Sequence, residues 1–195
     1  TITLDILKQL RQNPINESIS SSTIHYDLTS AMIKSLRGSN IDASLYYLAR
    51  LIDGGESVDY ITRRLVIFAS EDIGNANPQA LNLATSTMLS CNKIGYPESK
   101  IIMGQCVVYL ASSPKSNSSY LAINEALHYV QEGNILDIPN QIKDKTIDYK
   151  NPHNFGGFVE QKYINTNKVF YNTKDIGYEN TLSLWIKKIK NKDDN

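Results

Sequence analysis

Two adjacent carboxylates, Glu71 and Asp72, follow an apolar helical stretch of this 195-residue sequence. A pair of carboxylates can act as general acid and general base in catalysis. Neighbouring residues do not face each other on a helix, however, so these two groups are poorly placed to act on one substrate atom. We therefore interpret them as structural residues that pair with Arg63 and Arg64, or with a neighbouring helix end, and fix the turn at Gly74.

Basic side chains recur through the same part of the chain and could form a phosphate-binding patch. Charged residues on amphipathic helices usually face water, so we favour solvated faces and ion pairs over phosphate contacts. The 20 basic and 20 acidic residues cancel, which gives no overall attraction to DNA or to an anionic membrane. The candidates for phosphate contact or for structural ion pairs are Lys34, Arg37, Arg63, Arg64, Glu71, Asp72, Lys115 and Asn117.

The sequence contains no motif for a nucleotide-binding or a metal-binding site. It contains no G-x-x-x-x-G-K-[ST] phosphate loop and no Walker B carboxylate pair, which a nucleotide site needs. It also lacks C-x-x-C and H-x-x-x-H spacings that bind zinc. Cys91 and Cys106 lie among apolar neighbours, which predicts reduced, buried thiols. We assign no catalytic residue, metal ligand or cofactor to this chain, because a Cys–His nucleophile, the remaining alternative, is rare.

The elements that position these residues are predicted to be helices. Helical periodicity runs almost without a break from His25 to Gly133 and predicts an all-α, multi-helix bundle. A short helix is expected at Thr3–Leu10, followed by a polar connection. Beyond Gly133 we expect a small irregular or β-hairpin appendage and a final helix over Tyr178–Lys190. The expected divisions are residues 1–24, 25–133 and 134–195.

The last two predicted helices each carry an apolar stripe, and we expect the stripe of the final helix to face inward. The stripes are Tyr120, Ile123, Leu127 and Val130 in the first helix, and Leu182, Trp185 and Ile189 in the second. Helix starts are predicted at Ser39, which forms a capping box with Asp42, and at the N-caps Asn77 and Asn117.

No apolar stretch approaches the roughly 20 residues that cross a bilayer. The N-terminus also lacks the basic start and apolar segment of a signal peptide. We therefore expect a cytoplasmic protein with no membrane partner. Because the sequence begins at Thr1 and not at Met, we interpret it as a piece of a longer protein.

Short motifs follow one another in order over residues 25–180. They are His25-Tyr26-Asp27-Leu28, Ser30-Ala31, Lys34-Ser35-Leu36-Arg37-Gly38-Ser39, Asp42-Ala43, Tyr46, Leu48-Ala49-Arg50, Tyr60-Ile61, Arg63-Arg64-Leu65, Ala69-Ser70-Glu71-Asp72-Ile73-Gly74, Pro78, Ala80, Pro114-Lys115-Ser116-Asn117, Tyr120, Pro152-His153, Gly156-Gly157, Val159, Gln161-Lys162-Tyr163 and Tyr171. This ordered set resembles the C-terminal region of the MgsA/RarA family of AAA+ ATPases. The sequence departs from the family pattern between Ile138 and Tyr149, where members usually carry a longer basic segment.

The resemblance implies a clamp-loader-collar-like helical region that holds an oligomer together. It implies that Thr1 to about Ser22 is the tail of an AAA+ lid, and that ATP and Mg²⁺ bind a missing N-terminal module. It also implies DNA and replication-fork proteins as partners of the whole protein, which would associate with the nucleoid.

We expect this chain to be an oligomerisation region, most simply of a tetramer, of an AAA+ ATPase acting in replication, recombination and repair at stalled forks. The alternative is a monomeric DNA-binding or adaptor module that uses the basic residues on phosphates. A separate small enzyme is a third possibility, which the missing motifs disfavour.

Overall fold

The computed structural model describes residues 22–190, and the helix expected at Thr3–Leu10 lies outside them. Within the described range the chain forms seven α-helices and no strand, so the all-α prediction is confirmed. The appendage after α7 is accordingly irregular, and the β-hairpin alternative is wrong for these residues.

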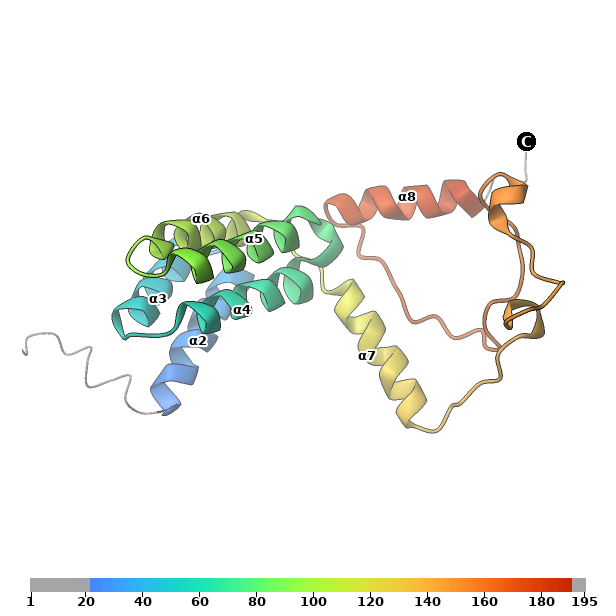
Figure 1. The fold of residues 1–195 in the computed structure, drawn as a ribbon, viewed down its shortest axis with the longest axis horizontal. Helices are drawn as coiled ribbons and strands as arrows, with labels where there is room; N and C mark the ends of the chain where they lie inside the picture. Colours follow the sequence, from blue (N-terminus) through green and yellow to red (C-terminus); the bar gives the residue numbers. More distant parts are fainter. Residues whose placement is uncertain (1–21, 191–195) are drawn as a thin grey trace, which may run out of the picture.

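Five helices pack into one body, which occupies the left half of Figure 1. They are α2 (Ser22–Arg37), α3 (Ile41–Asp53), α4 (Val58–Phe68), α5 (Gln79–Ile94) and α6 (Ser99–Ser112). α6 contacts all four of the others and carries apolar residues around its circumference, as expected for a central helix. The core includes Met32, Leu36, Ile61, Leu65 and Phe68, together with the buried free thiols of Cys91 and Cys106.

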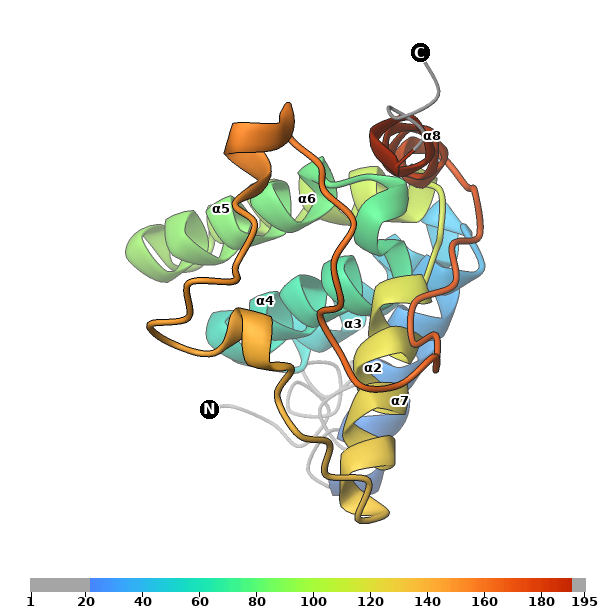
Figure 2. The same ribbon diagram turned by 90° about the vertical axis from the view of Figure 1, so that its right-hand side faces the viewer.

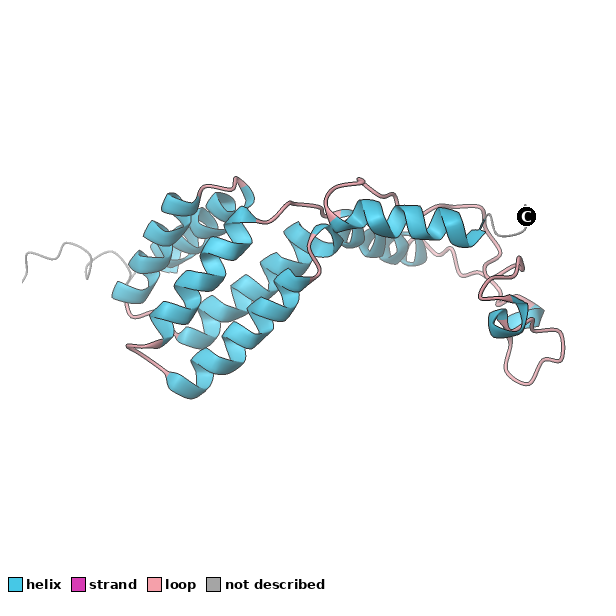
Figure 3. Ribbon diagram, turned by 90° about the horizontal axis from the view of Figure 1, so that it is seen from above, coloured by secondary structure: helices cyan, strands magenta, loops and turns pink. Residues whose placement is uncertain are grey.

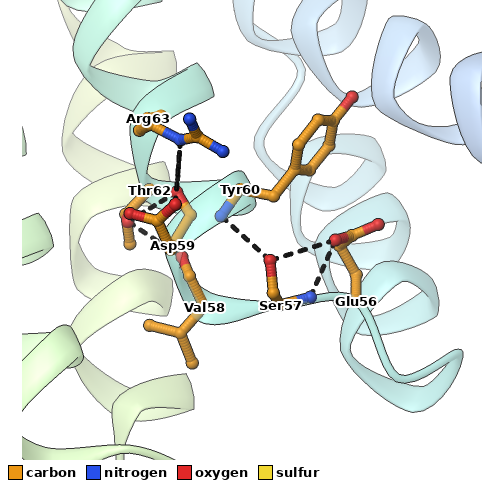
Figure 4. Close-up of polar contacts among 7 residues, drawn as sticks. All are labelled: Glu56, Ser57, Val58, Asp59, Tyr60, Thr62 and Arg63. Carbon is orange, nitrogen blue, oxygen red and sulfur yellow. Dashed lines mark hydrogen bonds and ion pairs between the residues drawn. The ribbon is translucent and has the colours of Figure 1, made fainter.

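Polar residues at the turns decide where the helices of the body begin. Asn40, and not the predicted Ser39, caps α3, because its side chain accepts a hydrogen bond from the amide of Ala43 at 2.9 Å. Ser39 instead has a positive φ of 55°. Figure 4 shows the start of α4, where the hydroxyl of Ser57 accepts a hydrogen bond from the amide of Tyr60.

The chain between α4 and α5 is not a simple turn. α4 widens into a π-helical turn, η1 (Ala69–Ile73), and then tightens into a 3₁₀ turn, η2 (Gly74–Ala76). π-helical turns are rare and often occur at functional sites. This segment carries both Glu71 and Asp72.

Two further helices extend away from the body. α7 (Ser118–Gln131) and α8 (Tyr178–Lys190) diverge from one end of it, as Figures 1 and 2 show. Residues 134–177, here called the arm, connect them through an extended path with two 3₁₀ turns, Asn140–Ile142 and Pro152–Phe155. Seen from above, α8 and the arm lie beyond the body (Figure 3).

The predicted bounds of α8 are confirmed, but the prediction that its stripe faces inward is wrong. Trp185 is 52% exposed and Ile189 39%, whereas the buried residues of α8 are Glu179 and Ser183. In α7, all four stripe residues are between 42% and 57% exposed. Neither stripe is covered, because α7 and α8 contact the body mainly through their first turns and η2.

Candidate functional site

α7 and α8 meet the body in a polar region that we call the junction. It comprises η1 and η2, the loop of residues 113–118, and residues 171–179. Two glycines allow the backbones to approach closely there. A Cβ on Gly74 would lie 2.9 Å from the carbonyl oxygen of Ser116, and a Cβ on Gly177 would contact the carbonyl oxygen of Ala76. Both glycines also have positive φ angles, which favour glycine.

A buried carboxylate, Glu179, anchors the first turn of α8 in the junction. Its Oε1 accepts hydrogen bonds from the hydroxyl of Tyr171 at 2.9 Å and from the amide of Lys174 at 3.1 Å. Its Oε2 is buried and makes no hydrogen bond of good geometry, although the hydroxyls of Ser116 and Ser118 lie near the carboxylate.

The pKa of Glu179 reflects two opposing effects. Burial of the side chain opposes ionisation and raises the pKa, but nearby hydroxyl and amide donors outweigh it, so the pKa falls to about 2. Ser116 and Ser118 also lie at the start of α7, where the helix dipole favours a negative charge. Glu179 therefore joins α8 to α7 as an ionised carboxylate.

Arg37 and Asp72 connect the end of α2 to η1. The guanidinium donates from Nε to Oδ1 at 2.5 Å and from Nη2 to Oδ2 at 3.0 Å, in a bidentate arrangement. This hydrogen bond to Asp72 is the largest influence that raises the pKa of Arg37. Of the two predicted alternatives for Asp72, pairing with Arg63 or Arg64 is wrong, and pairing with a neighbouring helix end is confirmed, because the π-helical turn directs Asp72 toward the end of α2.

Lys115 of the junction loop uses its ammonium group entirely on partners within the chain. It donates to the hydroxyl of Ser39 at 3.0 Å, to the carbonyl of Ala111 at 3.0 Å and to the carbonyl of Ser113 at 2.5 Å. A lysine ammonium has three N–H donors, so these acceptors satisfy all of them. Burial lowers the pKa of Lys115, against an opposing effect of Asp72.

Asn117 and Asn77 hold neighbouring segments together and do not cap helices through their side chains. The Oδ1 of Asn117 accepts a hydrogen bond from Lys174 of the arm, while its backbone carbonyl starts α7. The amide of Asn77 donates to Tyr109 and Ser113 of the α6 end. Asn117 is the N-cap residue of α7 as predicted, although its side chain makes no capping hydrogen bond, whereas the N-cap residue of α5 is Pro78 and not the predicted Asn77.

The remaining candidate residues lie apart from this cluster. Arg63 pairs with Asp59 of the same helix at 3.0 Å, and both side chains are exposed (Figure 4). Arg64 lies over the ring of Tyr60, 5.9 Å from its centroid, and Lys34 is exposed on α2. Glu71 is the exception, because it lies next to Asp72 in η1 and lines a shallow hollow between α4 and α7. The structure thus brings together Arg37, Glu71, Asp72, Lys115 and Asn117, and separates Lys34, Arg63 and Arg64.

Sequence reasoning missed the two residues that dock α8. Glu179 occupies the first turn of a helix, where an acidic residue is ordinary, so nothing marked it as buried. Gly177 directly precedes that helix, and only the position of Ala76, a hundred residues earlier, makes it necessary.

The junction offers contacts for positioning and no group suited to covalent chemistry. Arg37 and Asp72 pair with each other, while Lys115 donates hydrogen bonds to the backbone and Glu179 accepts one from it. Among residues 22–190, no three His, Cys, Asp or Glu side chains come together to bind a metal ion. None of the helices in this range is both long and apolar enough to cross a membrane.

Comparisons with known proteins match the chain over nearly its whole described length. Residues 38–190 match the family described as "MgsA AAA+ ATPase C terminal". The replication-associated recombination protein A of Bacillus subtilis is 40% identical over 190 residues, which cover 90% of this chain and 45% of that protein. The protein of the same name from Coxiella burnetii is 45% identical over 130 residues, covering 64% and 30%.

A eukaryotic relative is also similar. The ATPase WRNIP1 of Dictyostelium discoideum is 45% identical over 93 residues, which cover 48% of this chain and 11% of that protein. The chain spans less than half the length of each of these relatives.

Proposed function

The chain belongs to the C-terminal family of the MgsA AAA+ ATPases, and on that premise we propose that it is the region through which such an ATPase assembles into an oligomer. A tetramer is the state that we propose. The family match confirms the prediction that this chain is a C-terminal region of the family. Its assembly into an oligomer is our proposal.

The observation that carries this proposal is the pair of uncovered apolar stripes on α7 and α8. The body buries a core of its own, with Met32, Leu36 and Ile61 fully inaccessible, although it also exposes apolar residues such as Leu89 and Ile101. The two stripes repeat at helical spacing yet remain exposed, and large contiguous apolar surfaces of this kind commonly mark protein interfaces. Stable interfaces bury roughly 1,200–2,000 Å² in total, so the stripes need a partner of substantial size.

The junction supports the same proposal because it sets the directions of α7 and α8. Glu179 and Gly177 hold the start of α8 against η2, and Asn75 donates to the hydroxyl of Ser119 at the start of α7. Two surfaces held in a defined relation can join several copies in a closed, symmetric arrangement. In this proposal the candidate residues Arg37, Asp72, Lys115 and Asn117 are structural.

The wider role of the whole protein follows from its relatives and is also proposed. We propose that ATP and Mg²⁺ act in a module outside this chain, and that the assembled ATPase works on DNA in replication and recombination, in the bacterial cytoplasm close to the nucleoid. The names of the relatives support the role in replication and recombination, and the family description supports an ATPase module. The divisions at residues 25–133 and 134–195 would then correspond to the body with α7 and to the arm with α8.

A monomeric DNA-binding module is the second candidate function, and the geometry favours it less. Phosphate binding needs free donors from lysine or arginine. Arg37 and Lys115 already donate to partners within the chain, and Arg63 and Arg64 contact residues of their own helix. Of the basic candidates this leaves Lys34, and one lysine makes too few phosphate contacts for a DNA-binding site.

Light scattering over a range of concentrations tests the proposed assembly. We expect a mass that approaches four times the 21.9 kDa of one chain at micromolar concentration. Leu127→Glu, which places a charge in the α7 stripe, is expected to lower that mass. The matched control is Ile147→Glu, because Ile147 is 97% exposed on the arm and outside both stripes. A mass of one chain, unchanged over a tenfold rise in concentration, would reject the proposal.

A further inference from the structure

An apolar groove of about 400 Å³ lies between the outer half of α7 and the arm. Ala126, Tyr129 and Val130 of α7 line one side. The outgoing part of the arm, residues 134–142, and the returning part, residues 163–170, line the others. Pockets of this size are large enough to bury a bulky apolar group.

Specific contacts fix the returning part of the arm on α7. The ring of Phe170 packs edge-on against Tyr129, with the ring centroids 5.6 Å apart. The ammonium of Lys168 lies 2.6 Å from a carboxylate oxygen of Glu125 and 5.2 Å from the centre of the Tyr129 ring. The hydrogen bond between Lys168 and Glu125 raises the pKa of the lysine and lowers that of the glutamate.

The two parts of the arm are also joined to each other. The side chain of Asn165 donates to the carbonyl of Asp137 at 2.6 Å, and Gln141 donates to the carbonyl of Lys162 at 2.7 Å. The groove is therefore defined by packing and hydrogen bonds along its length, and its apolar lining is left without an occupant from the described chain.

The stripe on α8 is apolar, as a helix that fills this apolar groove has to be. Tyr178 extends the stripe of Leu182, Trp185 and Ile189 by one turn to four residues at helical spacing, and the rings of Tyr178 and Trp185 make an edge contact. No α8 residue lines the groove of its own chain. The first turn of α8 is held in the junction, and Lys190 at its other end lies beside residues 158–161 of the arm.

We infer that this groove receives the α8 stripe of a second copy of the chain, with Trp185 between the two parts of the arm. The inference rests on the proposed function and names the surfaces that meet. In a twofold arrangement each copy supplies one helix and one groove, so every contact occurs twice.

Charge and area support the second copy as the occupant. α8 ends in Lys187, Lys188 and Lys190, whereas Asp137 lines the groove and Glu132 lies at the end of α7 beside it. If each stripe residue buries on the order of 80 Å² more, two stripes and two matching grooves remove roughly 1,300 Å² from water. That area falls within the usual range for a stable interface.

The experiment uses the fluorescence of Trp185, the single tryptophan of the sequence. Emission and light scattering are recorded on the same samples of the whole chain across a dilution series. We expect the emission to move to shorter wavelength as the mass rises, because the indole leaves water. Ile138→Glu charges the groove, since Ile138 lines it and is 60% exposed. It should weaken the association at least tenfold and keep the emission at long wavelength, whereas Ile147→Glu should behave as the parent chain.

Other outcomes overturn the inference in distinguishable ways. A rising mass with constant emission would leave the assembly intact and reject α8 as the occupant. An emission shift that Ile138→Glu does not affect would place Trp185 against another surface. Short-wavelength emission in the dilute monomer would mean that the chain covers its own α8. A constant single-chain mass would reject both this inference and the proposed function.

Discussion

The change Gly177→Ala tests whether the junction holds α8 in place. The new Cβ would contact the carbonyl oxygen of Ala76 and would lie 3.0 Å from Cγ of Pro114. A backbone carbonyl cannot rotate away as a flexible side chain can, so the start of α8 must shift by about 1 Å to restore van der Waals contact. The φ of Gly177, +59°, adds a cost of about 1–2 kcal/mol for any residue with a Cβ.

The shift would also disturb Glu179, which is only two residues away. Losing one charge-assisted hydrogen bond to its carboxylate costs about 1.5–3 kcal/mol. Together with the φ term, the docking of α8 should weaken by about 2.5–5 kcal/mol, which raises the equilibrium constant for its opening by roughly a hundredfold or more. The body should be unaffected, because none of its core residues belongs to this contact.

Hydrogen exchange of individual amides measures this effect directly. In Gly177→Ala, the amides of α8 should exchange about a hundredfold faster, while those of α4 and α5 keep their rates. The matched control is Gly156→Ala, because Gly156 has a positive φ of 74° but a Cβ there meets nothing within 4 Å. Unchanged exchange in α8, or an equal change in both variants, would refute the account of the junction.

Three further predictions concern charges and ligands. The docking of α8 should be pH-dependent: the folded pKa of Glu179, about 2, lies below its usual 4.5, so its contribution is complete above about pH 4.5 and is lost as the pH falls toward 2. Hydrogen exchange at several pH values checks this, and Glu179→Gln should weaken docking and remove the dependence. Arg37→Ala should cost about 1 kcal/mol and Arg63→Ala less than about 0.5 kcal/mol, because the first pair is bidentate and Asp72 is nearly covered, whereas both partners of the second are exposed. Urea denaturation compares the two variants, and an equal loss would contradict the structural role of Arg37. The chain alone should not bind ATP, since no phosphate loop occurs in it, and micromolar affinity in calorimetry would contradict this.

Local patterns in the sequence were enough to predict the helices themselves. Apolar spacing, glycines and prolines are properties of neighbouring residues, and helix formation depends mainly on neighbours. The bounds of α8, Tyr178–Lys190, were predicted for this reason. The absence of a phosphate loop is likewise a property of the sequence alone.

The direction in which an apolar stripe faces is not a local property. The stripes of α7 and α8 have the pattern of core-facing helices, yet Leu127 and Trp185 are exposed because only the first turns of these helices reach the body. The same spacing serves a core and an interface equally well, since both remove apolar surface from water. Only the tertiary structure distinguishes the two.

The junction depended still more on the tertiary structure. Asp72 pairs with Arg37, 35 residues earlier, and not with the nearer Arg63, because a π-helical turn redirects the chain between them. Lys115 reaches Ser39 across 76 residues. The sequence by itself determined which residues could form ion pairs and which helices would form. The packing of the body decided which charges meet, because contacts between distant segments depend on the path of the whole chain.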